Sequence, residues 1–288
     1  MLNVLVTGAS GQLGSEIKAL ASTYQYNFFF TDKESLDITD EQKINIFVQE
    51  NKIEVIVNCA AYTAVDKAEE DVENADRVNH LATKHLARVA KENQLKLIHI
   101  STDYVFNGEN FKPYVEEDLT SPNGVYGKTK LDGENAMIEI NPLNSIIIRT
   151  SWVYSVYGNN FVKTMLRLGK DKDTLGVIFD QVGSPTYAKD LAQAILEILP
   201  KIDNQNVEIY NYSNEGVLSW YDFAKEIMKM AQIECNVNSI ETYEYPTPAK
   251  RPHYSLLNKS KIKEKFKIEV PYWKDGLDDC LTRLGEKK

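Results

Sequence analysis

The 288-residue sequence has few of the residues that build disulfides or metal centres. It contains three cysteines and four histidines, and none of them has a CxxC or HxxxH spacing. Structural zinc sites and disulfide frameworks need such paired ligands, so neither is predicted. The chain also lacks a long apolar run and a basic, then apolar, N-terminal segment, which are the marks of a membrane span and a secretory signal. We therefore expect a soluble protein of a reducing compartment, the cytoplasm.

Basic residues are in the minority. Lys and Arg number 33 against 42 Asp and Glu, so the formal net charge is −9. This acidic surface argues against a general binder of nucleic acid or of anionic membranes. Hydrophobic residues make up 43% of the chain, which is enough for a core and excludes wholesale disorder.

Short apolar segments alternate with helical segments through the first half of the chain. The expected strands cover residues 2–7, 28–31, 55–58, 95–101 and 145–150, and helical segments at 14–20, 41–50 and 75–93 lie between them. This alternation is typical of right-handed βαβ units with a parallel sheet. We predict a Rossmann-type doubly wound α/β domain over residues 1–150, to which residues 176–200 return. Residues 151–288 are expected to form mainly a smaller C-terminal substrate-binding lobe.

A glycine turn ends the first expected strand and opens a helix. It reads Gly8-Ala9-Ser10-Gly11-Gln12-Leu13-Gly14. A dinucleotide pyrophosphate needs backbone without interfering Cβ atoms and the positive end of a helix. In this reading Gly8 allows the tight turn, Gly11 the close approach and Gly14 the packing of helix on strand. The spacing GxxGxxG differs by one residue from GxGxxG, but its position at the first βα turn predicts a cofactor site.

The second strand ends in an acid that can select the cofactor. Asp32 can accept hydrogen bonds from an adenosine ribose, whereas the adjacent Lys33 can meet a 2′-phosphate, so both NADH and NADPH stay open. Asp37, followed by Ile38, is placed to meet the adenine amino group.

Small residues follow the third strand, in the run Asn58-Cys59-Ala60-Ala61-Tyr62-Thr63. Small side chains at the carboxyl end of a strand let a flat ligand pass close by. For Cys59 itself we expect plain core packing, because a buried cysteine is most often a small hydrophobe.

Three residues form the expected catalytic group. Thr102 ends the fourth strand, and Tyr126 and Lys130 lie at i and i+4, on one face of a helix. A phenol has an unperturbed pKa of about 10, and a nearby cation lowers it. Lys130 is expected to lower the pKa of Tyr126 in this way, while the Thr102 hydroxyl holds a substrate carbonyl beside the phenol. YxxxK alone is a weak signal; its order after a glycine turn and a strand-end Thr is much more specific.

Taken together these motifs resemble the extended short-chain dehydrogenase/reductases and, among them, the dTDP-4-dehydrorhamnose reductase family. The resemblance covers nearly the whole chain and is carried by TGASGQLG (7–14), VNCAAYTAVDKAE (57–69), STDYVF (101–106), YGKTK (126–130), RTSWVY (149–154), DQVGSPT (180–186) and KRPHYS (250–255). It implies a Thr102, Tyr126 and Lys130 triad, with Tyr126 and Lys130 also touching the cofactor. It implies further dinucleotide contacts at Gly11, Gln12, Leu13, Asp37, Ile38, Ala61, Tyr62 and Thr63, and places Asp103 and Trp152 against the sugar.

The implied reaction is reduction of the 4-keto group of dTDP-4-dehydro-β-L-rhamnose to dTDP-β-L-rhamnose by NADPH or NADH. Related 4,6-dehydratases place a Glu after Thr-Asp, where this chain has Tyr104, so elimination lacks its base and ketone reduction is the better reading. Two alternatives stay open. One is a reductase of another dTDP-4-keto-6-deoxyhexose, and the other is a non-catalytic subunit resembling the regulatory subunit of methionine adenosyltransferase.

The remaining expectations concern the substrate and assembly. A dTDP-sugar carries a diphosphate that a chain at −9 repels at long range, so Lys250 and Arg251 are the expected local cations. Trp152 offers an aromatic face to the deoxysugar, and Tyr104 is expected to line the same cleft. The family resemblance allows magnesium at a dimer interface through Glu16, but not in the chemistry. Both a monomer and a homodimer are compatible with the sequence.

Overall fold

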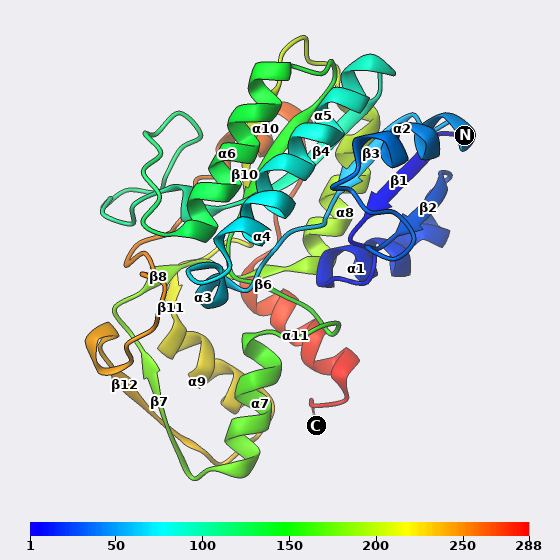
Figure 1. Ribbon diagram of the computed structural model, residues 1–288. Helices are drawn as coiled ribbons and strands as arrows, with labels where there is room; N and C mark the ends of the chain where they lie inside the picture. Colours follow the sequence, from blue (N-terminus) through cyan, green and yellow to red (C-terminus); the bar gives the residue numbers. More distant parts are fainter. Residues whose placement is uncertain (288) are drawn as a thin grey trace.

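The computed structural model describes residues 1–287 and has a six-stranded parallel sheet at its centre (Figure 1). Its strands are β1 (Asn3–Thr7), β2 (Asn27–Thr31), β3 (Val55–Asn58), β4 (Lys96–Thr102), β5 (Ile146–Thr150) and β10 (Glu208–Tyr212), in the spatial order β10-β5-β4-β3-β1-β2. The chain moves outward from β1 to β2 and then crosses back to β3. The carboxyl ends of β1 and β3 therefore flank the switch point at which open α/β sheets bind ligands.

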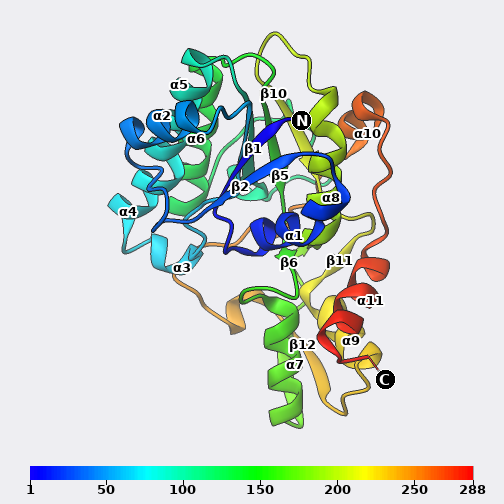
Figure 2. The same ribbon diagram turned by 90° about the vertical axis from the view of Figure 1, so that its right-hand side faces the viewer.

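Helices cover both faces of this sheet (Figure 2). The helices α2 (Glu41–Glu50), α5 (Ala82–Glu92) and α6 (Val125–Ile140) bury Ile44, Leu86 and Met137 on one face. On the other face, α1 (Gln12–Leu20), α8 (Ala188–Ile198) and α10 (Ser260–Phe266) bury Ile17, Ile195 and Phe266. Strands enclosed on both faces need continuous apolar runs, as in β1, where Val4, Leu5 and Val6 are all buried. The predicted doubly wound Rossmann-type fold is confirmed.

The long helix expected over 75–93 is interrupted. Two helices, α3 (Val65–Ala68) and α4 (Val72–Asp76), lead into a π-helical turn at Arg77–Leu81, which continues directly into α5. π-helical turns inside helices are rare and occur mostly at functional sites. Arg77 and Val78 of this turn line a cavity at the carboxyl edge of the sheet. Shorter 3₁₀ segments lie at Ala21–Thr23, Asp103–Val105, Leu199–Lys201 and Thr242–Glu244.

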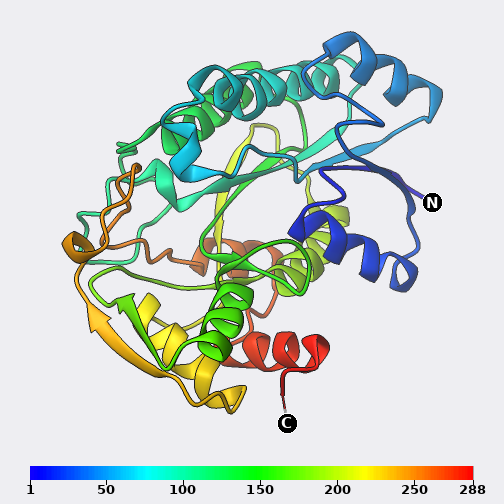
Figure 3. The ribbon, with the colours of Figure 1, turned by 60° about the horizontal axis from the view of Figure 1, so that its bottom comes forward.

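A second apolar core forms the smaller lobe below the sheet (Figure 3). It contains α7 (Phe161–Asp171), α9 (Trp220–Met230) and α11 (Trp273–Leu284), with β7 (Thr174–Ile178) paired to β12 (Asn236–Ile240). Two short pairs connect it to the sheet: β6 (Val153–Tyr154) with β9 (Thr186–Tyr187), and β8 (Val182–Gly183) with β11 (Leu218–Ser219). Ser219 caps α9 in a capping box with Asp222.

After residue 150 the chain alternates several times between the sheet and the smaller lobe. β7 ends within 176–200 but belongs to the smaller lobe, whereas α8, β10 and α10 pack on the sheet. The sheet's edge strand therefore comes from the segment that the sequence assigned mainly to the lobe. Within residues 1–287, none of the helices has the length and apolarity that a bilayer span requires.

Candidate active site

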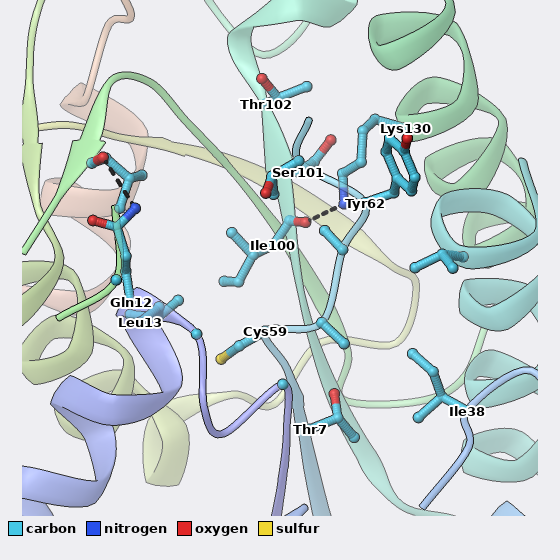
Figure 4. Close-up of a pocket in the computed structure, with 18 of the residues that line it drawn as sticks. Thr7, Gln12, Leu13, Ile38, Cys59, Tyr62, Ile100, Ser101, Thr102 and Lys130 are labelled. Carbon is cyan, nitrogen blue, oxygen red and sulfur yellow. Dashed lines mark hydrogen bonds between the residues drawn. The ribbon is translucent and has the colours of Figure 1, made fainter. Parts of the chain in front are cut away.

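A cavity of about 890 Å³ opens at the carboxyl ends of β1, β3 and β4, where the sheet meets the smaller lobe (Figure 4). This volume lies in the upper part of the range usual for ligand and cofactor sites. Most residues predicted for the site line it: Gly8, Ser10, Gly11, Gln12, Leu13, Asp32, Asp37, Ile38, Ala60, Ala61, Tyr62, Thr63, Thr102, Asp103, Tyr104, Tyr126, Lys130 and Trp152. Gly14, Lys250 and Arg251 lie outside this lining.

The glycine turn forms the floor of the cavity. Gly8 has φ of +65°, and a Cβ there would lie 2.6 Å from the backbone nitrogen of Ala60, so the two strand ends approach each other only through glycine. Helix α1 starts at Gln12 without a side-chain cap, which leaves its first N–H groups and its positive end open to an anion. A Cβ on Gly14 would lie 2.4 Å from the carbonyl oxygen of Gly8, so Gly14 serves helix packing. These features fit a dinucleotide pyrophosphate.

The end of the cavity that is predicted to hold an adenosine contains two acids, Asp32 and Asp37, whose carboxylates are already engaged. Asp37 Oδ1 accepts from the Thr39 backbone N–H at 3.0 Å and from the Thr39 hydroxyl at 2.8 Å. Asp32 Oδ1 accepts hydrogen bonds from the backbone N–H groups of Glu34 and Ser35, at 3.1 Å each, and the contacts with Ser35 hold the pKa of Asp32 below its usual value. Lys33 and Arg77 line the same end. A ligand group that reaches this point therefore meets two cations and two carboxylates that already accept hydrogen bonds from their own turns.

Asn79 connects the loop after β3 to helix α6 by hydrogen bonds. Its side chain accepts from the Tyr62 N–H at 2.9 Å and donates to the Tyr62 carbonyl at 3.2 Å and to Thr129 Oγ1 at 3.1 Å. Asn79 is 1% exposed, and it lies in the π-helical turn. The only sign of this role in the sequence is a polar residue within an apolar helical pattern.

Helix α6 is held so that Tyr126 faces the cavity. Its N-cap is Gly124, which has no side chain, and Glu69 Oε1 instead accepts from the Val125 N–H at 2.9 Å. A Cβ on Gly127 would lie 2.2 Å from the carbonyl oxygen of Tyr104, so the helix approaches the end of β4 more closely than any other residue allows. The Tyr104 ring meets the Tyr126 ring edge-on, with 5.5 Å between centroids.

The pKa of Tyr126 lies in the opposite direction from the sequence expectation. Burial raises it to about 12, with a hydrogen bond between Thr102 and Tyr126 opposing the rise and Asp103 adding to it. Lys130 does not lower it, because its Nζ is directed to the Ile100 carbonyl at 2.6 Å and to His99 Nε2 at 3.3 Å. Figure 4 shows the bond to Ile100. In the cofactor-free protein Tyr126 is therefore a protonated phenol.

Asp103 is an acid kept near its point of titration. It is 2% exposed, and burial raises its pKa to about 7. Thr102 Oγ1 donates to its Oδ1 at 3.0 Å, while Oδ2 has no hydrogen-bond partner among the described residues. A buried carboxyl group with a free oxygen on a cavity wall is suited to a ligand hydroxyl.

Trp152 and the predicted basic pair have different surroundings. Trp152 lines the cavity with its ring stacked on Trp220, at 3.6 Å between centroids. Arg251 forms an ion pair with Asp66, at 2.7 Å, and Lys250 is exposed. A neighbouring carboxylate therefore engages Arg251 and Lys250 faces solvent, and diphosphate binding by this pair stays a prediction.

Glu16 does not fit a metal ion. Its carboxylate is buried, both oxygens are 2.9–3.0 Å from Arg283 Nη1, and Ser155 donates to it at 2.6 Å. A cation already neutralises this carboxylate within the same chain. Residues 1–287 also contain no group of three or more His, Cys, Asp or Glu side chains placed to hold a metal.

Cys59 packs against the core, as predicted from the sequence, and it also lines the cavity. Burial raises the pKa of its thiol to about 12, so it stays protonated. Other cavity residues were not predicted from the sequence. Arg77, Val78 and Asn74 contribute from the α4 region. They lie outside the glycine and YxxxK motifs, and only the π-helical turn, which has no sequence signature, brings them to the site.

The comparisons with known proteins agree with this geometry. The model of the RmlD substrate binding domain family matches residues 2–286. A dTDP-4-dehydrorhamnose reductase from Aggregatibacter actinomycetemcomitans is 42% identical over 287 residues, covering 96% of this chain and 97% of that protein. The crystal structure of a dTDP-4-dehydrorhamnose reductase from Clostridium acetobutylicum superposes with a TM-score of 0.94 at 42% identity, covering 99% and 100% of the two chains. That of the Bacillus anthracis reductase in complex with NADP gives 0.93 at 37% identity, covering 98% and 100%.

Fold and site together define a Rossmann-type oxidoreductase of the short-chain dehydrogenase/reductase class. Within that class the chain belongs to the dTDP-4-dehydrorhamnose reductase family. The family resemblance expected from the sequence motifs is confirmed.

Proposed function

We propose that this protein reduces the 4-keto group of dTDP-4-dehydro-β-L-rhamnose to give dTDP-β-L-rhamnose. The observation that carries the proposal is the convergence of Thr102, Tyr126 and Lys130 in one cavity with the glycine turn. Relatives named for this reaction match the chain over almost its whole length, and their activity is what the site is suited to perform.

The protein's own residues supply the proton and the orientation. When bound, a reduced nicotinamide dinucleotide supplies the hydride that the carbonyl carbon accepts. Tyr126 donates its phenolic proton to the carbonyl oxygen as that oxygen gains charge, and its raised pKa keeps the proton available at neutral pH. Thr102 orients the carbonyl through its hydroxyl. Lys130, beside Tyr126 on the same helix, holds the ribose and stabilises the phenolate that remains.

We propose that the protein accepts NADPH as well as NADH. Support for NADPH comes from Lys33 and Arg77 at the adenosine end of the cavity and from the engagement of Asp32 in its own turn. A phosphorylated ribose gains charge-assisted hydrogen bonds from such cations. Titration of the purified protein with each dinucleotide measures the preference.

For the sugar diphosphate we propose that Arg251 exchanges its partner. Its ion pair with Asp66 is partly exposed, and the guanidinium is close enough to Tyr104 to affect the pKa of that cavity residue. If Arg251 swings from Asp66 to the diphosphate, Arg251→Met should raise the KM for the sugar nucleotide about 10-fold or more, because a charge-assisted contact contributes roughly 1.5–3 kcal/mol. Steady-state kinetics measure this.

The matched control for Arg251 is Asp66→Asn. It removes the competing carboxylate and should leave the KM unchanged or lower it. If both variants raise the KM alike, the ion pair only holds the loop that carries Arg251 in place, and Arg251 does not bind the diphosphate.

The proposed activity is tested with the purified protein, the dTDP-4-keto sugar and NADPH or NADH. Loss of the reduced-nicotinamide absorbance, with a product whose NMR spectrum is that of dTDP-β-L-rhamnose, supports it. A product with another configuration at C4 would assign a reductase of a different deoxyhexose. No oxidation of either dinucleotide would contradict an enzymatic role.

A further inference from the structure

The side chain beneath Lys130 is a histidine that the proposed reaction does not use. His99 lies on β4 and is fully buried. Its Nδ1 is 3.0 Å from Asn58 Nδ2, and its Nε2 is 3.3 Å from Lys130 Nζ. Burial, the largest cause, holds the pKa of His99 well below its usual value. The imidazole is therefore neutral and carries a single N–H.

Asn58 determines which nitrogen of His99 carries that proton. Its Oδ1 accepts from the Ala60 backbone N–H at 3.2 Å and from the Thr7 hydroxyl at 2.7 Å. Because a backbone N–H can only donate, the amide oxygen of Asn58 has to face Ala60, and the amide nitrogen faces His99. Nδ1 of His99 is then the acceptor, and the proton of the neutral ring resides on Nε2.

This Nε2–H is directed at Lys130, whose Nζ also donates to the Ile100 carbonyl at 2.6 Å. An ammonium group has three donors and no acceptor, so it cannot accept the Nε2–H. A neutral amine has a lone pair that accepts from His99 while one of its own hydrogens still bonds to Ile100. All of these hydrogen bonds form together only when Lys130 has lost one proton.

The other groups near Lys130 do not cancel this preference. On its own helix, Glu134 favours the ammonium, but both of its oxygens bond to Arg149 of β5 at 2.7–3.2 Å. Tyr126 is uncharged at neutral pH, and Asn58 and Thr7 from β3 and β1 are neutral. Burial lowers the pKa of Lys130 to about 8 even with Glu134 opposing the shift.

We propose that His99 is a positioning residue for Lys130: its Nε2–H holds the side-chain amine against the Ile100 carbonyl and favours the uncharged form while no cofactor is bound. The catalytic consequence rests on the proposed role of Lys130. If the charged lysine holds the ribose, cofactor binding draws a proton onto it, and the affinity for the dinucleotide falls as pH rises above the pKa of Lys130.

The direct test is NMR on the cofactor-free protein. With ¹⁵N-labelled histidine, wild-type His99 should show the Nε2–H tautomer from about pH 6 to 9, and an Nδ1–H tautomer would overturn the proposal without any substitution. With lysine labelled at Cε, the Lys130 signal, assigned by its loss in Lys130→Arg, reports the pKa of that amine.

Two substitutions of His99 then separate positioning from packing. His99→Gln places an amide oxygen where it can accept from an ammonium, and His99→Asn removes the Nε2 position. Both should raise the pKa of Lys130 by about one unit or more, a tenfold change in its proton affinity. Ile98→Val is the control for packing, because Ile98 lies on the same strand but in the core on the face of the sheet away from α6. It should lower stability without changing the pKa of Lys130. An unchanged or lower pKa in the folded His99 variants would overturn the proposal.

A different result would show that Lys130 lacks the proposed catalytic role. Lys130→Met with wild-type turnover would remove Lys130 from the chemistry, whereas the tautomer and the pKa in the cofactor-free protein would still report on His99.

Discussion

At the scale of single residues, burial raises the pKa values of the acidic groups near Thr102 in the candidate active site. Burial is the largest cause of the raised pKa values of Asp103, Tyr104 and Tyr126. The charged form of each group is disfavoured by removal from water. In the proposed reaction, Tyr126 would therefore stay protonated until the substrate oxygen gains charge.

The buried Asp103 should make stability depend on pH. A carboxyl group whose folded-state pKa lies above its unfolded value contributes stability that is fully present below about pH 4 and is lost as pH rises through about 7. Asp103→Asn keeps the shape and cannot ionise. Relative to that variant, wild type should lose up to roughly 4 kcal/mol of unfolding free energy between pH 4 and 8.5. Urea denaturation at the two pH values measures it, and a constant difference would show that Asp103 ionises freely.

At this scale the sequence predicts which residues line the site better than it predicts their pKa values and hydrogen-bond partners. Thr102, Tyr126 and Lys130 follow from strand ends and the i, i+4 spacing, and the structure brings them to one cavity. The direction of the Tyr126 pKa did not follow. Spacing cannot show that the Lys130 amine is directed toward Ile100 and His99, or that burial outweighs a nearby cation.

At the scale of elements, α6 is the part that has to be placed most accurately. Glu69 caps its first turn, Gly127 lets it touch the end of β4, and Asn79 bonds to Thr129 on its inner face. The sequence predicts the helix from its pattern, but it does not reveal these partners. Glu69 and Asn79 lie 56 and 50 residues before the residues that they contact, and a buried amide such as Asn79 has no periodic signature.

Gly127→Ala should disturb both the stability and the activity. The added methyl group would lie 2.2 Å from the Tyr104 carbonyl oxygen, so α6 must shift, and overpacking of this kind costs about 1–3 kcal/mol. Turnover should fall together with the urea midpoint, because Tyr126 moves with the helix. Lys128→Ala, an exposed change on the same turn, is the control. Wild-type turnover in Gly127→Ala would show that the helix tolerates the displacement.

At the scale of the whole molecule, an ion pair fastens the end of the chain to its beginning. Arg283 of α11 contacts Glu16 of α1, and Tyr187 bonds both Arg283 and Asp279. Glu16 lies one turn into the helix that carries the glycine turn. The smaller lobe is therefore tied to the cofactor-binding element by a charge that is buried on one side.

Removing only the cation of this ion pair should lower the free energy of unfolding more than removing both charges. Arg283→Met leaves the Glu16 carboxylate buried without a cation and should lower the free energy of unfolding by about 3–5 kcal/mol. Adding Glu16→Gln in the same chain should restore much of that loss, because the stranded charge is gone while Ser155 can still bond to the amide. Thermal or urea unfolding measures both. An equal loss in the single and double variants would mean that Arg283 acts through packing alone.

The division into lobes shows where sequence reading reaches its limit. Alternating strands and helices are enough to predict the parallel sheet over residues 1–150, because each βαβ unit is local. The return of β10 to the sheet edge depends on pairing with β5 some 60 residues earlier, and β7 pairs with β12 in the other lobe. Single strands of this kind carry no mark of which sheet they join.

The central claim is that Tyr126 donates the proton in a ketone reduction, and single-turnover kinetics test it most directly. Tyr126→Phe, mixed with the dTDP-4-keto sugar and a reduced dinucleotide, should bind the dinucleotide as tightly as wild type. Its hydride-transfer rate should be roughly 10²–10⁴ lower, the usual contribution of a positioned proton donor. Wild-type hydride transfer in Tyr126→Phe would contradict the account.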